Sequence, residues 1–201
     1  MRILNLYCGI GGNRKLWPEG HEITAVENDP DIAKIYQDFF PNDKVIVADA
    51  HQYLLDHFKE FDFIWSSPPC QSHSVVRFIA MNRIKRPQKP IFPDMKLYEE
   101  IIFLQNYYKG NYTVENVKGY YEPLVKPQVI SKHYIWANFF INSLPSKSRE
   151  HRSSIEVLEK RKGFNLKDIK IAKRKVLRNC VEPELGLHIF LEANREYKTL
   201  L

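Results

Sequence analysis

The stretch Ile3-Leu4-Asn5-Leu6-Tyr7-Cys8-Gly9-Ile10-Gly11-Gly12, at residues 3–12, decides the fold. It is a short apolar run that passes directly into a glycine-rich turn. Glycines at such a turn let the backbone come close to a ligand, and a helix that starts there exposes free amide groups. Because the same pattern also occurs in plain tight turns, the residues that end the other apolar runs must decide between the two interpretations.

Further short runs rich in β-branched and aromatic residues follow, and stretches with helical spacing alternate with them. This alternation predicts an α/β fold with a parallel sheet and helices on its faces. A short helix is expected after Gly12, interrupted by Trp17-Pro18. The expected strands are 3–7, 22–26, 44–48, 61–65, 112–114 and a long aromatic strand at 133–141; the other expected helices are 31–39, 94–109 and 182–201.

The composition fits one compact domain and excludes several classes of protein. The chain has 201 residues, of which 44% are hydrophobic and 27% charged, too much apolar material for a disordered chain. No apolar run approaches the roughly 18 residues of a membrane span. The net charge of +6 permits a polyanionic partner. The three cysteines form no disulfide framework, so we expect free thiols and a cytoplasmic protein.

Two carboxylates end the second and third runs. Ligands of open parallel sheets lie beyond the carboxyl ends of the strands. Glu27 follows Gly9 by 18 residues, the distance at which a second-strand carboxylate can bind the hydroxyl groups of a ribose. Asp49 ends the third run, where it could accept a hydrogen bond from an adenine amino group. These positions predict a cofactor that contains adenosine.

The fourth and fifth runs end in groups that could carry out a reaction. The turn at residues 66–71 contains two prolines, which hold the thiol of Cys70 in place before a substrate arrives. Glu115 ends the fifth run and could give a proton to the group that the thiol attacks. A structural cysteine in a proline-rich loop is the alternative for Cys70 alone.

Six stretches, in this order along the chain, are similar to the motifs of the cytosine-C5 DNA methyltransferases. The resemblance implies a Rossmann-like, S-adenosylmethionine-dependent methyltransferase fold, with a mostly parallel sheet and helices on both faces. It also implies a DNA (cytosine-5)-methyltransferase activity of the kind found in restriction-modification systems. The six stretches are residues 5–12, 26–28, 48–50, 67–72, 114–117 and 178–183.

The resemblance further implies S-adenosyl-L-methionine as cofactor, and it assigns residues to each part of it. The methionine part, the ribose, the adenine and the carboxylate end each take residues from a different stretch. The implied cofactor-binding residues are Tyr7, Gly9 and Gly11, then Glu27, then Asn28, Asp49 and Ala50, then Asn179 and Val181, with Pro69 of the catalytic loop beside them.

By the same resemblance, Cys70 attacks C6 of a cytosine and Glu115 binds or protonates N3, so that C5 becomes nucleophilic. Gln71 and Asn116 belong to the same two motifs. Lys132, with His133, stands where the family has arginines. Because C6 cannot be reached inside a duplex, the implied partner is DNA with a flipped cytosine.

Two features concern the partner. Residues 77–90 hold five basic side chains and no acidic one, which favours a nucleic-acid contact. Only about 40 residues separate Phe140 from Arg178, far fewer than the family's recognition region. We therefore expect a catalytic core at 1–141, a reduced basic recognition-like segment at 142–176, and a C-terminal motif with a helix at 177–201 that returns to the core.

Three alternatives remain open from the sequence. The same chemistry could act on RNA, because the motifs do not distinguish the sugar. The chain could be a subunit or DNA-binding module that needs a partner chain for target recognition. A nicotinamide-dependent dehydrogenase would share the first turn, but it would give Cys70 and Glu115 no task.

Overall fold

The computed structural model describes residues 1–145 and 153–195 and shows one mixed sheet, in the order β3-β2-β1-β4-β5-β7-β6. The first five strands are parallel, as the sequence predicted. β7 runs antiparallel to both of its neighbours, β5 and β6. The strands are β1 (Arg2–Leu6), β2 (Glu22–Glu27), β3 (Lys44–Val47), β4 (Phe63–Ser66), β5 (Asn111–Val117), β6 (Gln128–Ile130) and β7 (His133–Ala137).

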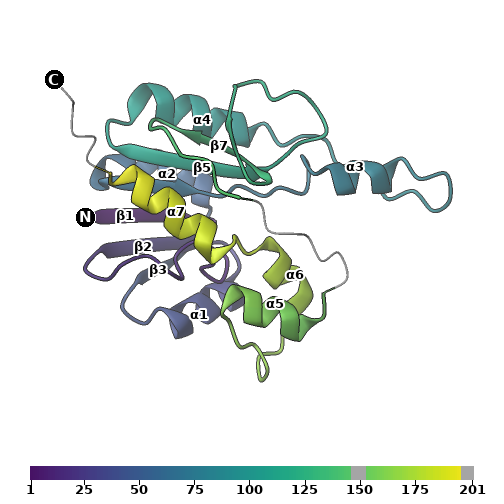
Figure 1. Cartoon of the computed structure of the whole chain (residues 1–201), viewed down its shortest axis with the longest axis horizontal. Helices are drawn as coiled ribbons and strands as arrows, with labels where there is room; N and C mark the ends of the chain where they lie inside the picture. The colour runs from purple at the N-terminus through teal and green to yellow at the C-terminus, as the bar shows by residue number, and fades with distance from the viewer. Residues whose placement is uncertain (146–152, 196–201) are drawn as a thin grey trace.

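Helices cover both faces of this sheet (Figure 1). One face carries α2 and α4, and the other carries α1 and α7. The expected helices at 31–39 and 94–109 are confirmed as α1 and α4, and the structure contains four further helices in its described residues, α2, α3, α5 and α6. The helices are α1 (Pro30–Phe39), α2 (Ala50–His57), α3 (Val75–Met81), α4 (Lys96–Tyr107), α5 (Ile155–Lys162), α6 (Lys173–Asn179) and α7 (Pro183–Ala193).

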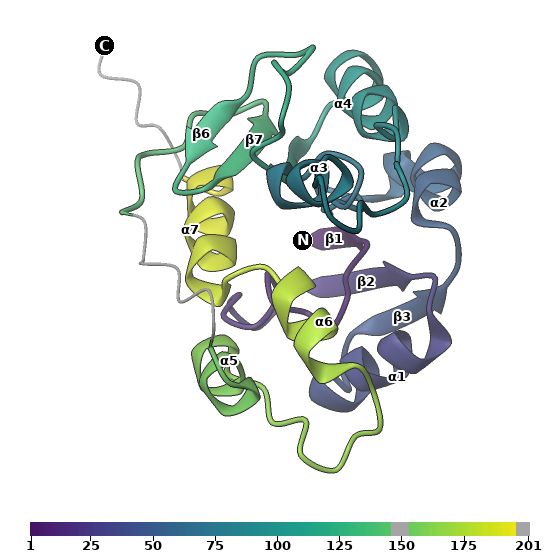
Figure 2. The same cartoon turned by 90° about the vertical axis from the view of Figure 1, so that its right-hand side faces the viewer.

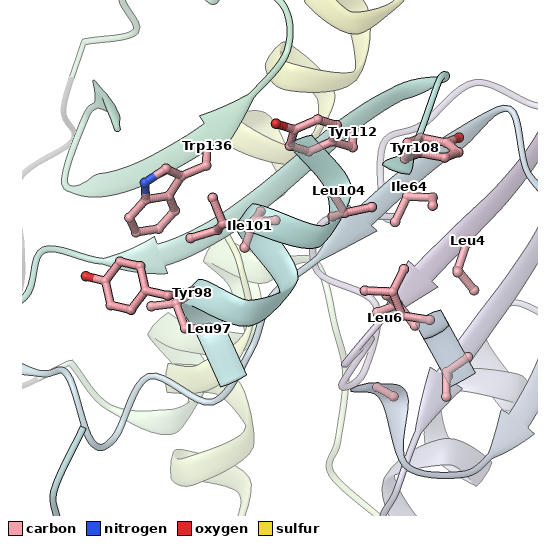
Figure 3. Packing of buried hydrophobic residues seen from close by; sticks show 14 residues of the cluster. Leu4, Leu6, Ile64, Leu97, Tyr98, Ile101, Leu104, Tyr108, Tyr112 and Trp136 are labelled. Carbon is pink, nitrogen blue, oxygen red and sulfur yellow. The ribbon is translucent and has the colours of Figure 1, made fainter. Parts of the chain in front are cut away.

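The larger core lies between the sheet and α4. Leu97, Ile101 and Leu104 follow one side of α4 at helical spacing and belong to the same buried cluster as Leu4 and Ile64 of the sheet, as Figure 3 shows. All of these side chains are buried. Because alternate residues of a strand point to opposite faces, the second core takes the other set of β1 and β4 side chains.

The prediction of a short helix after Gly12 is wrong, because residues 13–16 form turns. The C-terminal helix α7 covers this part of the sheet instead. Trp17 stacks on Phe190 of α7 with ring centroids 5.1 Å apart, and its indole N–H donates to the carbonyl of Gly186 at 3.2 Å. A helix distant in the sequence therefore fills the place that a local helix was expected to take.

The last two expected elements are shorter than predicted. The strand expected over 133–141 ends at Ala137, because the Asn138 side chain accepts the N–H of Tyr112 at 3.1 Å and takes the place of a strand partner. The terminal helix expected over 182–201 is confirmed over Pro183–Ala193, and residues 196–201 lie outside the described residues. Within the described part of the chain, no helix is long and apolar enough to cross a membrane.

The basic segment before α7 is folded onto the body of the protein. Phe164, Leu166, Val176 and Leu177 are buried in a cluster that also contains Ile35 of α1. The side chains that the sequence shows as sparse apolar residues among lysines and arginines are thus the ones that anchor α5 and α6. This packing leaves the charged side of α6 outward.

Candidate active site

The carboxyl ends of the parallel strands meet at one edge of the sheet, which Figure 2 shows nearest the viewer, with α3 and α6 on either side of β1. The strands are in level register, since Ile3 pairs with Ile23 and with Phe63, and Phe63 pairs with Asn111. The structure therefore brings the predicted turn, the two carboxylates and the loop that carries Cys70 to one edge.

The first turn has a backbone that accommodates a ligand. Gly9 and Gly11 have φ angles of +54° and +86°, in the region that favours glycine. A Cβ added at Gly9 would meet no atom within 4 Å, so open space lies beside the turn. Tyr7, with φ +53°, begins this turn.

Glu27 is fixed to this turn by backbone donors. Its Oε2 accepts the N–H of Gly9 at 3.0 Å, and its Oε1 accepts the N–H groups of Asn28 and Asp29 at 3.0 and 3.1 Å. A carboxylate has about four acceptor positions, so it retains capacity for a ribose hydroxyl. The glycine-rich turn and the end of β2 are therefore joined directly by the hydrogen bond between Gly9 and Glu27.

The other predicted cofactor residues lie along the same edge. Asp49 caps α2 by accepting the N–H of Gln52 at 3.0 Å, its side chain is largely exposed, and Ala50 after it is buried. Asn28 is exposed after the end of β2. The closing motif reaches the first turn, because a Cβ on Gly12 would lie 2.4 Å from the carbonyl oxygen of Val181. Asn179 is exposed at the end of α6.

These residues fit S-adenosyl-L-methionine. The open space at Gly9, the fixed carboxylate of Glu27 and the exposed carboxylate of Asp49 lie on consecutive strand ends, which matches the methionine–ribose–adenine order of the cofactor. Among the described residues, no group of histidine, cysteine and carboxylate side chains could hold a metal ion.

Cys70 lies half-buried in the loop after β4. Burial, and next the negative charge of Glu115, raise the pKa of its thiol to about 11. Its carbonyl accepts the N–H of His73 at 3.1 Å, which closes a tight turn after the two prolines. A raised pKa keeps the thiol protonated at neutral pH, and anything that removes the charge of Glu115 favours the thiolate.

Glu115 is buried, and both of its oxygens have partners. Oε2 accepts the hydroxyl of Ser67 at 3.0 Å, and the oxygen of Ser67 accepts the indole N–H of Trp65 at 2.8 Å. Oε1 lies 2.5 Å from Nδ1 of His133 on β7. Of Lys132 and His133, which the sequence placed at the position of the family's arginines, His133 makes this bond, while Lys132 lies half-buried in the preceding turn.

The two remaining residues predicted as catalytic, Asn116 and Gln71, and the predicted cofactor residue Pro69 hold or flank the loop. The side-chain amide of Asn116 donates to the carbonyl of Pro68 at 3.0 Å, so the end of β5 is tied to the loop that carries Cys70. Pro69 and Gln71, on either side of Cys70, are exposed. Exposure leaves these two side chains available to a bound substrate.

A buried carboxylate that the sequence analysis missed connects these parts. Glu100 of α4 is fully buried and accepts the hydroxyls of Tyr7 at 2.6 Å and Ser66 at 2.7 Å. Nδ1 of His51 in α2 lies 3.0 Å from it. Burial, and then Glu100, raise the pKa of Tyr7, whereas the bond to Glu100 raises the pKa of His51. The sequence carried one signal for this network: Glu100 is a charged residue at a position where the helical spacing of α4 places buried side chains.

The segment after Cys70 forms a projecting arm, defined here as residues 75–91, which contains α3 (Figure 1). Arg77 stabilises the arm from within, by donating to the carbonyl of Lys89 at 2.9 Å. The other four basic side chains predicted for nucleic-acid contact are exposed: Arg83, Lys85, Arg86 and Lys89.

Several solved structures resemble this chain. A Spodoptera frugiperda DNMT2 mutant is 27% identical over 59% of the chain, with a TM-score of 0.41, and the chain covers 36% of its length. A hypothetical protein from Thermus thermophilus is 18% identical, covers 68% of this chain and is itself covered over 73%, with a TM-score of 0.45. The Entamoeba histolytica methyltransferase EhMeth is 14% identical, with 79% and 59% coverage and a TM-score of 0.43.

No curated protein sequence matches the chain. A family model described as C-5 cytosine-specific DNA methylase matches residues 1–123, which include the glycine-rich turn, Glu27, Asp49, Cys70 and Glu115. The strand order of the sheet and the family match together show that the chain has the Rossmann-like methyltransferase fold, whose cofactor is S-adenosyl-L-methionine. The chain belongs to the C-5 cytosine-specific DNA methylase family.

Proposed function

We propose that the chain transfers a methyl group from S-adenosyl-L-methionine to C5 of a cytosine in DNA, through a covalent bond between Cys70 and the base. The observation that carries this proposal is the pairing of Cys70 with Glu115 at adjacent strand ends, where the charge of Glu115 acts on the thiol. A structural cysteine would not require a buried carboxylate with two fixed partners beside it.

The chemistry follows from these two groups. The sulfur of Cys70 forms a bond to C6 of the cytosine while Glu115, in its protonated form, donates a proton to N3. Electron density then accumulates at C5, which can accept an electrophilic methyl group; the bound cofactor supplies that group. Loss of the C5 proton to water and cleavage of the C6–S bond release the thiolate, and return of the N3 proton to Glu115 restores the neutral aromatic ring and the protonated carboxyl group.

Protonation couples the two residues. While Glu115 is charged, it raises the pKa of Cys70 and keeps the thiol in its unreactive form. Once the carboxyl group carries the proton meant for N3, that repulsion is removed and the thiolate forms more readily. Ser67 and His133 hold the two carboxyl oxygens in position for this exchange.

The test is transfer of labelled methyl groups from the cofactor to duplex DNA. Cys70→Ala should abolish transfer while calorimetry shows unchanged binding of S-adenosyl-L-homocysteine, because all the implied cofactor residues except Pro69 lie outside the loop that carries Cys70. Full activity of Cys70→Ala would refute the proposal.

DNA that contains 5-fluorocytosine should trap the wild-type protein covalently, because the fluorine cannot leave C5 as a proton does. A structured RNA in the same assay tests the other acceptor.

A second candidate is a catalytic chain whose target recognition comes from a partner chain. It is supported by the packing of residues 155–180 onto α1, which uses much of the short segment before the closing motif for the core. Bisulfite sequencing of DNA from expressing cells, compared with DNA treated with the purified chain, separates the two. Methylation seen only in cells favours the partner, and equal methylation with both samples refutes it.

A further inference from the structure

The outward side of α6 forms the wall of a basic groove. The groove has a volume of about 580 Å³ and is lined by Lys173, Arg174, Lys175, Arg178 and Asn179, with Ile155 and Ala172 completing it. Among the described residues, no acidic side chain lines it. The charged side chains that line this open hollow are all basic, which concentrates anions, and the nearby carboxylate of Glu156 in α5 interacts electrostatically with Arg174.

Two acidic side chains of the neighbouring segments are bound elsewhere. Glu182 pairs with Arg161 at 2.7 Å and with Lys162 at 2.8 Å, and Glu159 accepts the N–H of Leu166 at 2.7 Å. Within the part of the chain that the structure describes, no carboxylate forms an ion pair with the two lysines of the groove. The ammonium of Lys173 donates to the carbonyl of Lys167 at 2.6 Å, and a neutral carbonyl does not cancel its charge, so the charge of both lysines is left for a partner from outside.

The position of α6 relates this charge to the active site. Both views place α6 at the carboxyl edge of the sheet, on the opposite side of β1 from the arm that follows Cys70 (Figures 1 and 2). The arm carries exposed Arg83, Lys85, Arg86 and Lys89. Two basic elements therefore flank the edge where the target base must enter.

We infer that the basic groove of α6 binds the phosphate backbone of duplex DNA, so that the DNA is held on both sides of the active-site edge. This inference rests on the proposed function, because it assigns to the groove the same substrate. The cations of a short helix give charge contacts with phosphates without reading bases. Affinity contributed by this groove is consequently independent of sequence and sensitive to salt.

The experiment measures the salt dependence of binding to a DNA duplex with the double variant Lys173→Gln/Lys175→Gln. The control, Lys44→Gln/Lys109→Gln, removes the same charge from exposed lysines at the amino ends of β3 and β5. The slope of log K against log[salt] should become less steep by about 2 in the groove variant, and affinity in 0.1 M salt should fall by about one to two powers of ten. The control should keep the wild-type slope.

Equal slopes for the wild type and the groove variant would overturn the inference, and so would an equal change in both double variants. Because binding is measured without methyl transfer, it can be repeated in the Cys70→Ala background, where failure of the proposed chemistry has no effect on the result. Thermal unfolding verifies that each variant is folded. If the double variant does not fold, the single variant Lys175→Gln should make the slope of log K against log[salt] less steep by about 1.

Discussion

At the scale of single residues, the reactivity of Cys70 is set by its burial and by the charge of Glu115. Because the pKa of the thiol is raised to about 11, the fraction of thiolate increases about tenfold with each pH unit up to that value. The rate of alkylation by iodoacetamide should therefore rise steadily from pH 7 to about pH 11. Mass spectrometry identifies the modified residue, and Cys70→Ala gives the background from the buried Cys8 and Cys180.

Glu115→Gln should accelerate this alkylation at a fixed pH of about 8.5. The substitution removes the negative charge that is the second cause of the raised pKa, while the burial that is the first cause remains. The same variant should lose methyl transfer. An unchanged alkylation rate would show that burial alone sets the reactivity of the thiol.

The pair of His51 and Glu100 predicts a pH-dependent part of the stability. The folded-state pKa of His51 is raised above its ordinary value of 6.5, so the stabilisation is fully present below pH 6.5 and is lost as the pH rises through the folded-state pKa. Thermal unfolding between about pH 5.5 and 8.5 should show this decrease in the wild type. In His51→Gln the melting temperature should fall less steeply with pH. Equal pH slopes of the melting temperature in both proteins would contradict the prediction.

Residues of the site differ in how far the sequence predicts them. Glu27 ends β2, Glu115 lies two residues before the end of β5, and Cys70 follows the end of β4 by four residues, so position along the chain is enough to bring them to one edge. Glu100 could not be found this way, because its partners come from three other parts of the chain and only tertiary packing brings them together. For the same reason, the bond of His133 to Glu115 depended on the pairing of β5 with β7.

At the scale of elements, α7 requires a glycine where it crosses the first turn. A Cβ added to Gly186 would lie 2.3 Å from the carbonyl oxygen of Asn13, which is backbone and cannot move easily. Gly186→Ala should therefore destabilise the protein by about 2 kcal/mol through overpacking, although alanine at an ordinary helical position would stabilise by up to about 1 kcal/mol.

The control on the same helix is Leu191→Ala, at a side chain that is 53% exposed. It should change the free energy of unfolding by less than about 0.5 kcal/mol. Urea unfolding measures both variants. A stabilising effect of Gly186→Ala would mean that α7 can move away from the turn at little cost.

Elements with local signals were predictable, and those that depend on distant partners were not. The parallel strands and α1 and α4 have clear periodicity. The absent helix after Gly12 and the folded α5 and α6 depend on α7 and α1, which come from other parts of the chain. The sequence predicts residues 142–176 only as a reduced basic recognition-like segment, because it does not show that the few hydrophobic residues there share one cluster.

At the scale of the whole molecule, the second core joins both ends of the described chain. Ile3 and Trp17 pack with Leu185, Ile189 and Phe190. Phe190→Ala should cost about 3 to 4 kcal/mol, because it leaves a cavity beside the ring of Trp17. Tryptophan fluorescence and far-UV circular dichroism should report the same urea midpoint in the variant. Loss of fluorescence in a separate, earlier step would show that α7 unfolds independently.

The same core has a consequence during synthesis. A ribosome adds about 5 to 20 residues each second, so roughly 10 to 40 seconds pass between the appearance of Ile3 and that of Phe190. During this interval β1 is complete while the side chains on its second-core face lack the cover of α7. The nascent protein must therefore be protected from aggregation until α7 has emerged, and its yield in cells should depend on chaperones that bind exposed apolar strands.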